Sequence, residues 1–283
     1  MARALDLGTG CGVQALHLST HADHVVATDL SSRALWFAGL NASLNDLSWD
    51  LRRGSLLEPV AGQRFDLIVS NPPFVITPRR PDVPEYEYRD GGMVGDSLVR
   101  TLIRSLPGHL AAGGVAQLLA NWEVPAGGDW RDVVRRWVEP TGLDAWVIQR
   151  ETQDPAQYAE LWARDGGAAP GSAEYENLYA AWLSDFASRD VDHIGFGVVT
   201  LQRPAGERVP FIDLVAVGGP VASPMGPTID AAWRRAVGWF RPATTTCWRS
   251  PGRWHPTLPR SGSVDPVPTT RRSSGCAKVA GWD

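Results

Sequence analysis

Residues 65–74 read FDLIVSNPPF, and the rest of the chain is organised around this stretch. The apolar run at residues 67–69 predicts a buried strand, and NPPF at residues 71–74 predicts a stiff turn at its carboxyl end. Two prolines fix their φ angles and remove two N–H donors, so the carbonyl groups and the Asn71 amide have no strand neighbour. Ligands of open α/β sheets bind outside the carboxyl ends of the strands. The stretch therefore indicates a polar ligand at this turn, with an ordinary Asn-Pro turn as the alternative.

A glycine-rich turn, GTGCG, follows the first expected strand. It contains Gly8, Gly10 and Gly12 and leads into an expected helix. Glycines at such a turn let the backbone approach a ligand closely and present N–H groups at a positive helix end. The dinucleotide fingerprint needs its third glycine at the position of Val13. Because Lys278 is the only lysine, a catalytic Tyr-x-x-x-Lys pair is also missing, and a nicotinamide-dependent dehydrogenase is disfavoured.

Two further strand ends carry candidate ligand contacts. Asp29 ends the expected strand HVVAT, seventeen positions after Gly12. A carboxylate there can accept both hydroxyls of a ribose, or it can be a solvated helix-cap acid. Ser55 follows a short third strand around Leu51, where it can reach the edge of an adenine or serve as a plain turn serine.

These motifs together resemble those of the S-adenosylmethionine-dependent class I methyltransferases. The segment DLGTGCG at residues 6–12, Asp29 with its serine-rich helix cap, and NPPF have the family's order and spacing. Within that class the chain is most similar to the N-P-P-[YF] N-methyltransferases, which include release-factor glutamine methyltransferases and small-domain rRNA and DNA amino-methyltransferases. The resemblance implies an α/β, Rossmann-like fold. Its sheet is expected to be mostly parallel and seven-stranded, with helices on both faces and the last strand antiparallel.

The resemblance also implies S-adenosyl-L-methionine as the cofactor and assigns the residues that bind it. In the reaction, the side-chain oxygen of Asn71 and the carbonyl of Pro72 are expected to accept the two N–H bonds of a planar NH2 group. This favours a pyramidal nitrogen and stabilises positive charge as it forms, so no strong base is required. Phe74 is expected to pack flat on the planar group and exclude water. The expected cofactor contacts are Asp6, Gly8, Gly10, Gly12, Asp29 and Ser55.

Composition limits the other classes of function. The chain has 283 residues, a formal net charge of −4 and no apolar run near the ~20 residues that span a bilayer. Its three cysteines form no C-x-x-C pair or metal-ligand spacing, so neither a disulfide framework nor a metal site is expected. We expect a soluble, cytoplasmic protein.

The domain boundaries follow from changes in pattern. The methyltransferase domain is expected over residues 1–203, with inserted helices in residues 150–192 whose aromatic side chains form a core or stack on bases. Residues 204–240 are expected to be a C-terminal extension. Residues 241–283 lose all periodicity and carry seven Arg and Lys against two Asp, which predicts a disordered basic tail. A truncated or frameshifted gene would also explain the tail and the absence of an N-terminal recognition domain.

The identity of the acceptor stays open, because glutamine amides and the exocyclic amines of adenine and guanine all present a planar NH2. Residues 89–97 (RDGGMVGDS) resemble a segment of the glutamine methyltransferases. The inserted helices, the basic tail and the missing N-terminal domain favour nucleic acid, either rRNA or DNA, which we expect first. Arg79 and Arg80 can bind a phosphate or lie in a solvated loop. The alternatives are a protein glutamine substrate and a donor-binding scaffold without activity, and the oligomeric state stays open.

Overall fold

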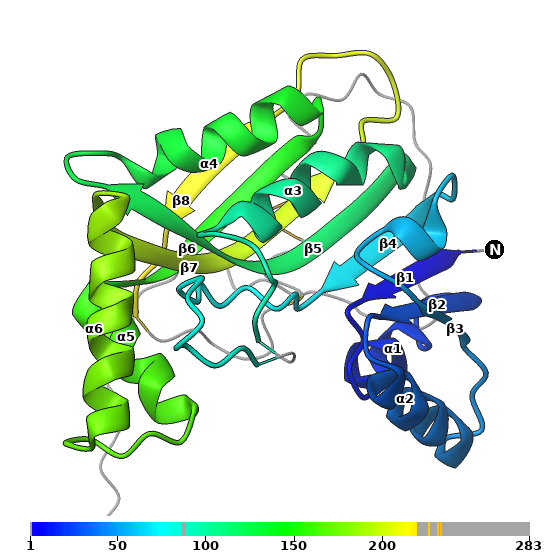
Figure 1. Ribbon diagram of the computed structural model, residues 1–283. Helices are drawn as coiled ribbons and strands as arrows, with labels where there is room; N and C mark the ends of the chain where they lie inside the picture. Colours follow the sequence, from blue (N-terminus) through cyan, green and yellow to red (C-terminus); the bar gives the residue numbers. More distant parts are fainter. Residues whose placement is uncertain (1, 87–88, 220–225, 227–230, 232, 234–283) are drawn as a thin grey trace, which may run out of the picture. The chain divides into compact units, whose positions relative to one another are not determined.

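The computed structural model describes residues 2–86, 89–219, 226, 231 and 233 (Figure 1). The chain divides into two compact units, Met1–Phe240 and Arg241–Asp283, and all described residues lie in the first. The basic tail expected at residues 241–283 therefore lies outside the described residues.

Among the described residues, eight strands form one sheet in the order β3-β2-β1-β4-β5-β7-β6-β8 (Figure 1). Strand β7 pairs antiparallel with β5 and β6, and the other neighbouring pairs are parallel. The central strands are apolar runs because helices cover parallel strands on both faces. The strands are β1 (Arg3–Leu7), β2 (His24–Asp29), β3 (Asp50–Arg53), β4 (Phe65–Ser70), β5 (Leu110–Pro125), β6 (Asp144–Gln153), β7 (Val191–Gln202) and β8 (Ile212–Ala216).

The mostly parallel α/β sheet with an antiparallel strand is confirmed, but the strand count of seven is wrong. The eighth strand, β8, lies in the residues expected to be a C-terminal extension and pairs parallel with β6, from Ala145↔Ile212 to Gln149↔Ala216. The antiparallel strand is therefore β7 and not the last strand. The buried carboxylate of Asp144 holds the connection to β8 by accepting the N–H of Phe211 at 2.8 Å and pairing with Arg208.

Helices cover both faces of the sheet. Helices α3 and α4 pack with the side of β1 that carries Leu5 and Leu7, in the largest core. Helix α1 packs with Ala4 on the opposite side, because side chains alternate between the faces of a strand. None of the described helices has both the length and the apolar composition needed to span a bilayer. The helices are α1 (Val13–Leu18), α2 (Ser32–Leu44), α3 (Ser97–Ser105), α4 (Trp130–Val138), α5 (Pro155–Asp165) and α6 (Ala173–Ser188), with short 3-10 turns η1 (Glu58–Val60), η2 (Leu106–Gly108) and η3 (Glu139–Thr141).

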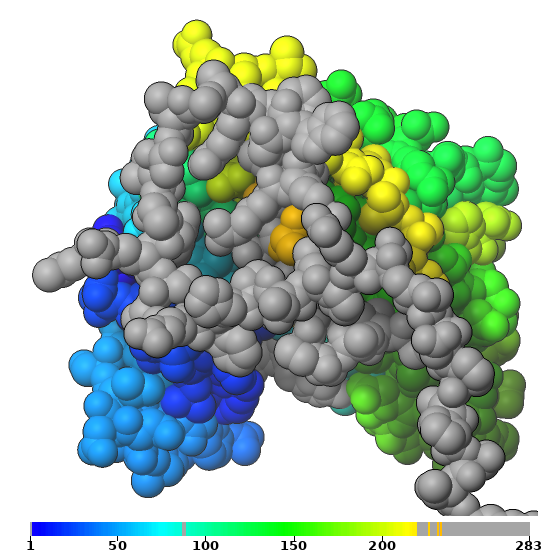
Figure 2. Space-filling model, turned by 180° about the vertical axis from the view of Figure 1, so that it is seen from behind, coloured from blue at the N-terminus to red at the C-terminus, as the bar shows by residue number. Residues whose placement is uncertain are grey.

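Helices α5 and α6 confirm the two helices predicted within residues 150–192. They form their own apolar cluster with the loop after β4 and with β7. Figure 2 shows the reverse side of the chain, with the first sixty residues in blue and the residues of α5 and α6 in green. Tyr158 and Trp182 are almost completely buried in the cluster, at 0% and 1% exposure. Both are core residues, so neither is available to stack on a base.

Candidate active site

The glycine turn and the Asn-Pro-Pro-Phe turn leave the sheet side by side. Strands β1 and β4 pair in parallel up to Leu7↔Ser70, so Gly8 and Asn71 are the residues that directly follow the two paired strands. The hydroxyl of Ser70 donates to the carbonyl of Leu7 at 2.8 Å and joins the two strand ends. Paired strands lie about 4.8 Å apart, so both turns border the same crevice.

Asp29 holds the glycine turn in place from the neighbouring strand. Its Oδ2 accepts the N–H of Gly10 at 2.9 Å, and its Oδ1 accepts the N–H of Ser31 at 2.8 Å. The preceding carbonyl, of Thr28, accepts the N–H of Gly8 at 2.9 Å. A carboxylate has about four acceptor positions, so Asp29 retains positions for two ligand hydroxyls.

The three glycines have different roles. Gly8 and Gly10 have φ of +72° and +56°, and no atom lies within 4 Å of the place where a Cβ would be. Their open sides leave room for a ligand against the backbone. Gly12, with φ of +90°, is needed for packing, because a Cβ there would lie 2.6 Å from a ring carbon of Trp49.

Asp6, on β1, is the buried acid of the site. It has no exposed surface, and its Oδ2 accepts a hydrogen bond from Thr9 at 2.6 Å. Its Oδ1 is buried without a hydrogen-bond partner among the described residues. Burial raises the pKa of Asp6 to about 6 against the effect of the Thr9 bond, and the nearby Asp29 carboxylate adds to the increase. Two neighbouring carboxylates with an unsatisfied oxygen suit a cationic ligand that can donate hydrogen bonds.

Ser55 extends the row of strand ends. Strand β3 pairs with β2 through Asp29↔Arg53, and the N–H of Gly54 donates to the Asp29 carbonyl at 3.1 Å. Ser55 itself is exposed. Strands β3, β2, β1 and β4 thus present Ser55, Asp29, the glycine turn and Asn71 in order. Three strand spacings span roughly 14 Å, which suits an extended ligand.

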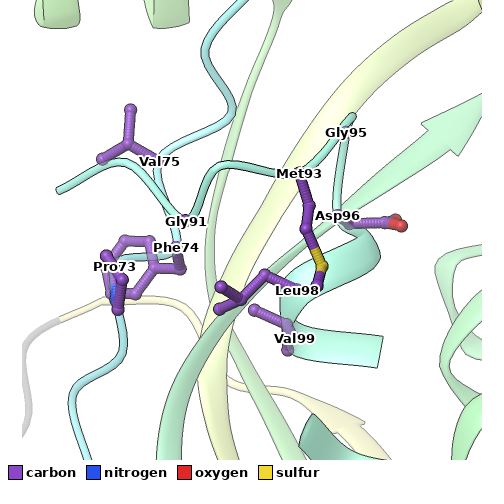
Figure 3. Close-up of a pocket in the computed structure, with 9 residues that line it drawn as sticks. All are labelled: Pro73, Phe74, Val75, Gly91, Met93, Gly95, Asp96, Leu98 and Val99. Atoms are coloured by element: carbon purple, nitrogen blue, oxygen red, sulfur yellow. The ribbon is translucent and has the colours of Figure 1, made fainter. Parts of the chain in front are cut away.

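The turn after β4 offers an accessible amide and a half-buried ring. Asn71 is exposed, and no described residue hydrogen-bonds to its side chain, whereas Pro72 is buried. Phe74 packs against the main core, and Figure 3 shows its ring on one side of a pocket with Leu98 on the other. The cavity is about 10 Å³, room for one water molecule. A planar acceptor group therefore has to approach the exposed side of the turn.

The returning end of the loop supports the turn from behind. A Cβ on Gly91 would lie 2.9 Å from the carbonyl oxygen of Pro73 and 2.3 Å from Leu98, so only glycine fits there. Asp90 accepts the N–H of Gly92 at 2.9 Å and pairs with Arg79. The Asp-Gly-Gly segment at residues 90–92 thus packs against the Asn-Pro-Pro-Phe turn and supports it.

Leu119 is a further candidate at this row of strand ends, and the sequence patterns did not single it out. Strands β4 and β5 pair up to Ser70↔Leu118, so Leu119 lies level with Asn71 on the next strand. Its side chain is 41% exposed although it lies within a central strand. The run VAQLLA predicts burial throughout, so this exposure gave no signal in the sequence. In the described part of the chain, no three His, Cys, Asp or Glu side chains gather as a metal site.

The family model for the methyltransferase small domain matches residues 1–137, which include the glycine turn, Asp29 and the Asn-Pro-Pro-Phe turn. The matched residues make up just under half of the chain, and this part of the chain is similar to that family. The match confirms the resemblance to the S-adenosylmethionine-dependent class I methyltransferases. The match to the methyltransferase small domain ends within α4, so β6 to β8 and the α5–α6 pair lie beyond it.

Three curated relatives are each similar to part of the chain. A release factor glutamine methyltransferase of Geobacter sulfurreducens is 40% identical over 122 residues, which cover 40% of this chain and 43% of the relative. Another from Xylella fastidiosa is 38% identical over 162 residues, covering 53% and 56%. The ribosomal RNA small subunit methyltransferase C of Salmonella arizonae is 33% identical over 125 residues, covering 44% and 32%. The chain thus spans about half or less of the length of these relatives.

Proposed function

We propose that the protein is an S-adenosylmethionine-dependent N-methyltransferase that acts on a planar NH2 group. The observation that carries the proposal is the register Leu7↔Ser70, from which an open glycine turn and the Asn71 amide emerge beside each other, the amide having no hydrogen-bond partner among the described residues. A methyl donor bound along the glycine turn would then lie next to acceptor oxygens, which is the proximity that methyl transfer needs.

The residues at the strand ends fit the adenosyl donor by their chemistry. Asp29 has acceptor positions left for the ribose hydroxyls, and exposed Ser55 lies at the end of the row where an adenine edge would be. The buried carboxylate of Asp6 would attract the positively charged methionine part through its charge. When bound, the donor supplies an electrophilic methyl group on a sulfonium.

The turn at residues 71–74, the acceptor turn, would orient the nucleophilic nitrogen of the substrate. The Asn71 side-chain oxygen and the Pro72 carbonyl would accept hydrogen bonds from the two N–H groups of the substrate. These bonds favour a pyramidal nitrogen, whose lone pair is less delocalised into the planar group. Charge that develops on nitrogen is stabilised by oxygens already in place. Phe74, held by the core on one side, packs its accessible side against the acceptor and excludes water.

The charges on the loop after the turn favour a neutral amide over a polyanion as substrate. Arg79 pairs with Asp90 and Glu85. Arg80 pairs with Asp82. Nucleic-acid affinity depends on cations that neutralise phosphates, and these arginines already have carboxylate partners. The two glutamine methyltransferases above are also more similar to the chain than the rRNA enzyme is. We therefore rank a protein glutamine side chain first.

A nucleobase amine, which the sequence patterns favoured, ranks second because an rRNA methyltransferase is also similar to part of the chain. We also propose that the protein works in the cytoplasm, since the relatives are named for release factors and ribosomal RNA, which belong to translation.

The deciding experiment uses the full-length protein, tritiated S-adenosylmethionine and cell extract separated into protein, RNA and DNA. We expect label in protein that protease removes and that is recovered as methylglutamine. Label that ribonuclease or deoxyribonuclease removes would favour the nucleobase instead. Donor binding without label in any fraction would identify a scaffold and contradict the proposal.

A further inference from the structure

The acceptor turn has no backbone anchor of its own. Pro72 and Pro73 lack N–H groups, and residues 72–74 form no backbone hydrogen bond with another described loop or turn. The first anchor after β4 is Val75, whose N–H donates to the carbonyl of Arg89 at 2.9 Å. A turn that holds two acceptor oxygens in fixed positions has to be stiffened by its surroundings.

Ile76, one residue later, is where support from outside the loop converges. Its N–H donates to the hydroxyl of Tyr158 at 2.8 Å, and its carbonyl accepts the indole N–H of Trp182 at 2.7 Å. The two aromatic residues come from α5 and α6, and both are buried. Side chains of the helix pair therefore take the place of a neighbouring strand for this residue.

The hydroxyl of Tyr158 also reaches the sheet. Asn121 of β5, which has no exposed surface, donates its Nδ2 to the same oxygen at 3.2 Å. The Tyr158 ring stacks on Phe196 of β7 with centroids 5.7 Å apart. One oxygen thus links the loop that begins at the acceptor turn to the strand that neighbours β4.

The other end of the loop is tied to α5. The hydroxyl of Tyr86 donates to the carbonyl of Gly166 at 3.0 Å. Arg89 donates to the carbonyl of Trp162 at 3.2 Å and pairs with Asp165. Its guanidinium lies 4.2 Å from the centre of the Tyr86 ring. Both ends of the loop are therefore attached to the helix pair.

We propose that the α5–α6 pair is a clamp that fixes the acceptor turn, with Tyr158 as its positioning residue. The apolar cluster of the two helices contains Val75, Ile76 and Val83 of the loop and is separate from the two other cores. Side chains of the loop thus form part of the apolar core of the helix pair. The inference rests on the proposed methyl transfer, because the clamp acts through the turn that holds the acceptor.

The test compares Tyr158→Phe with the wild-type enzyme in methyl transfer to the acceptor that the labelling experiment identifies. The substitution removes one oxygen and keeps the ring in its stack. We expect kcat to fall roughly tenfold to a hundredfold, because small displacements of reacting groups are costly. The dissociation constant of the donor should change less than about twofold, since Tyr158 contacts none of the proposed donor residues. Hydrogen exchange at the Ile76 amide should accelerate, while exchange at Ile68 in β4 should not.

Tyr179→Phe on α6 is the matched control, because its half-buried ring stacks on Tyr175 and its hydroxyl has no hydrogen-bond partner among the described residues. It should leave kcat and Ile76 exchange unchanged. Trp182→Phe should lower kcat as well, and its effect should not add fully to that of Tyr158→Phe, since both act on Ile76. An active wild type with unchanged kcat in both clamp variants would overturn the inference. An inactive wild type would overturn the proposed function.

Discussion

Replacing Asp6 by asparagine tests the electrostatics of the donor site, because the amide matches the protonated acid in size and lacks its charge. Burial raises the pKa of Asp6 from 3.8 to about 6. A carboxyl with a raised pKa holds its proton more tightly in the folded protein than in the unfolded chain. Its contribution to stability is therefore greatest below about pH 4, falls as the pH rises to about 6, and then stays constant. At about 1.4 kcal/mol for each pKa unit, the loss is about 3 kcal/mol.

The assay is denaturant unfolding of the donor-free protein between pH 4 and pH 8. Asp6→Asn should equal the wild type near pH 4 and exceed its free energy of unfolding by about 3 kcal/mol at pH 7. Asp96→Asn is the matched control, because burial also raises the pKa of Asp96 to about 6, and Asp96 lies outside the proposed donor contacts. It should show the same pH pattern and leave donor affinity unchanged, whereas Asp6→Asn should weaken donor binding. A stability difference that does not vary with pH would contradict the raised pKa of Asp6.

Two further predictions concern the glycine turn and its ligand. The dissociation constant of S-adenosylmethionine for the wild type should rise about tenfold for each pH unit below 6, because Asp6 has to lose its proton to face a cation. Isothermal titration calorimetry measures this dependence. A dissociation constant that does not change with pH would contradict it. Gly12→Ala should lower the free energy of unfolding by about 2–4 kcal/mol, since the new Cβ would be strained at φ +90° and would meet Trp49 at 2.6 Å. Gly62 has φ of +74° and no neighbour within 4 Å of a Cβ, so Gly62→Ala should lower the free energy of unfolding by only about 1–2 kcal/mol. Thermal and denaturant unfolding measure both variants. Equal losses of unfolding free energy in the two variants would be evidence against the Trp49 contact.

Most of the sheet could be predicted from local patterns, because a buried parallel strand is a short apolar run and its end is marked by glycine, proline or aspartate. The strands at residues 4–7, 24–28 and 67–69 are found within one or two residues of their predicted bounds. β8 was missed because its residues alternate only weakly between burial and exposure. Its place depends on Asp144 holding Phe211 and Arg208 from 64 to 67 positions away, which no local pattern encodes.

The neighbouring positions of the candidate site residues could be predicted from the sequence, whereas the contacts that support them could not. Asp6, Asp29 and Asn71 come together because their strands are neighbours in the sheet, and motif order implies that arrangement. The contact between Tyr158 and Ile76 joins residues 82 positions apart, and a tyrosine at helical spacing has the same pattern whether or not its hydroxyl holds a loop. The orphan oxygen of Asp6 and the exposure of Leu119 likewise follow from packing in three dimensions.

The single-turnover rate of methyl transfer in Asn71→Ala, with the donor dissociation constant measured on the same preparation, tests most directly whether Asn71 accepts the substrate N–H. Asn45→Ala is the control, because that exposed amide donates to the carbonyl of Asn41 at the end of α2 and to no other described residue. We predict that Asn71→Ala lowers the transfer rate roughly a hundredfold or more while donor affinity stays within about twofold, as expected for a group that acts on the transition state. A transfer rate equal to that of the wild type, or a loss explained entirely by weaker donor binding, would contradict the assignment of Asn71 as the acceptor of the substrate N–H.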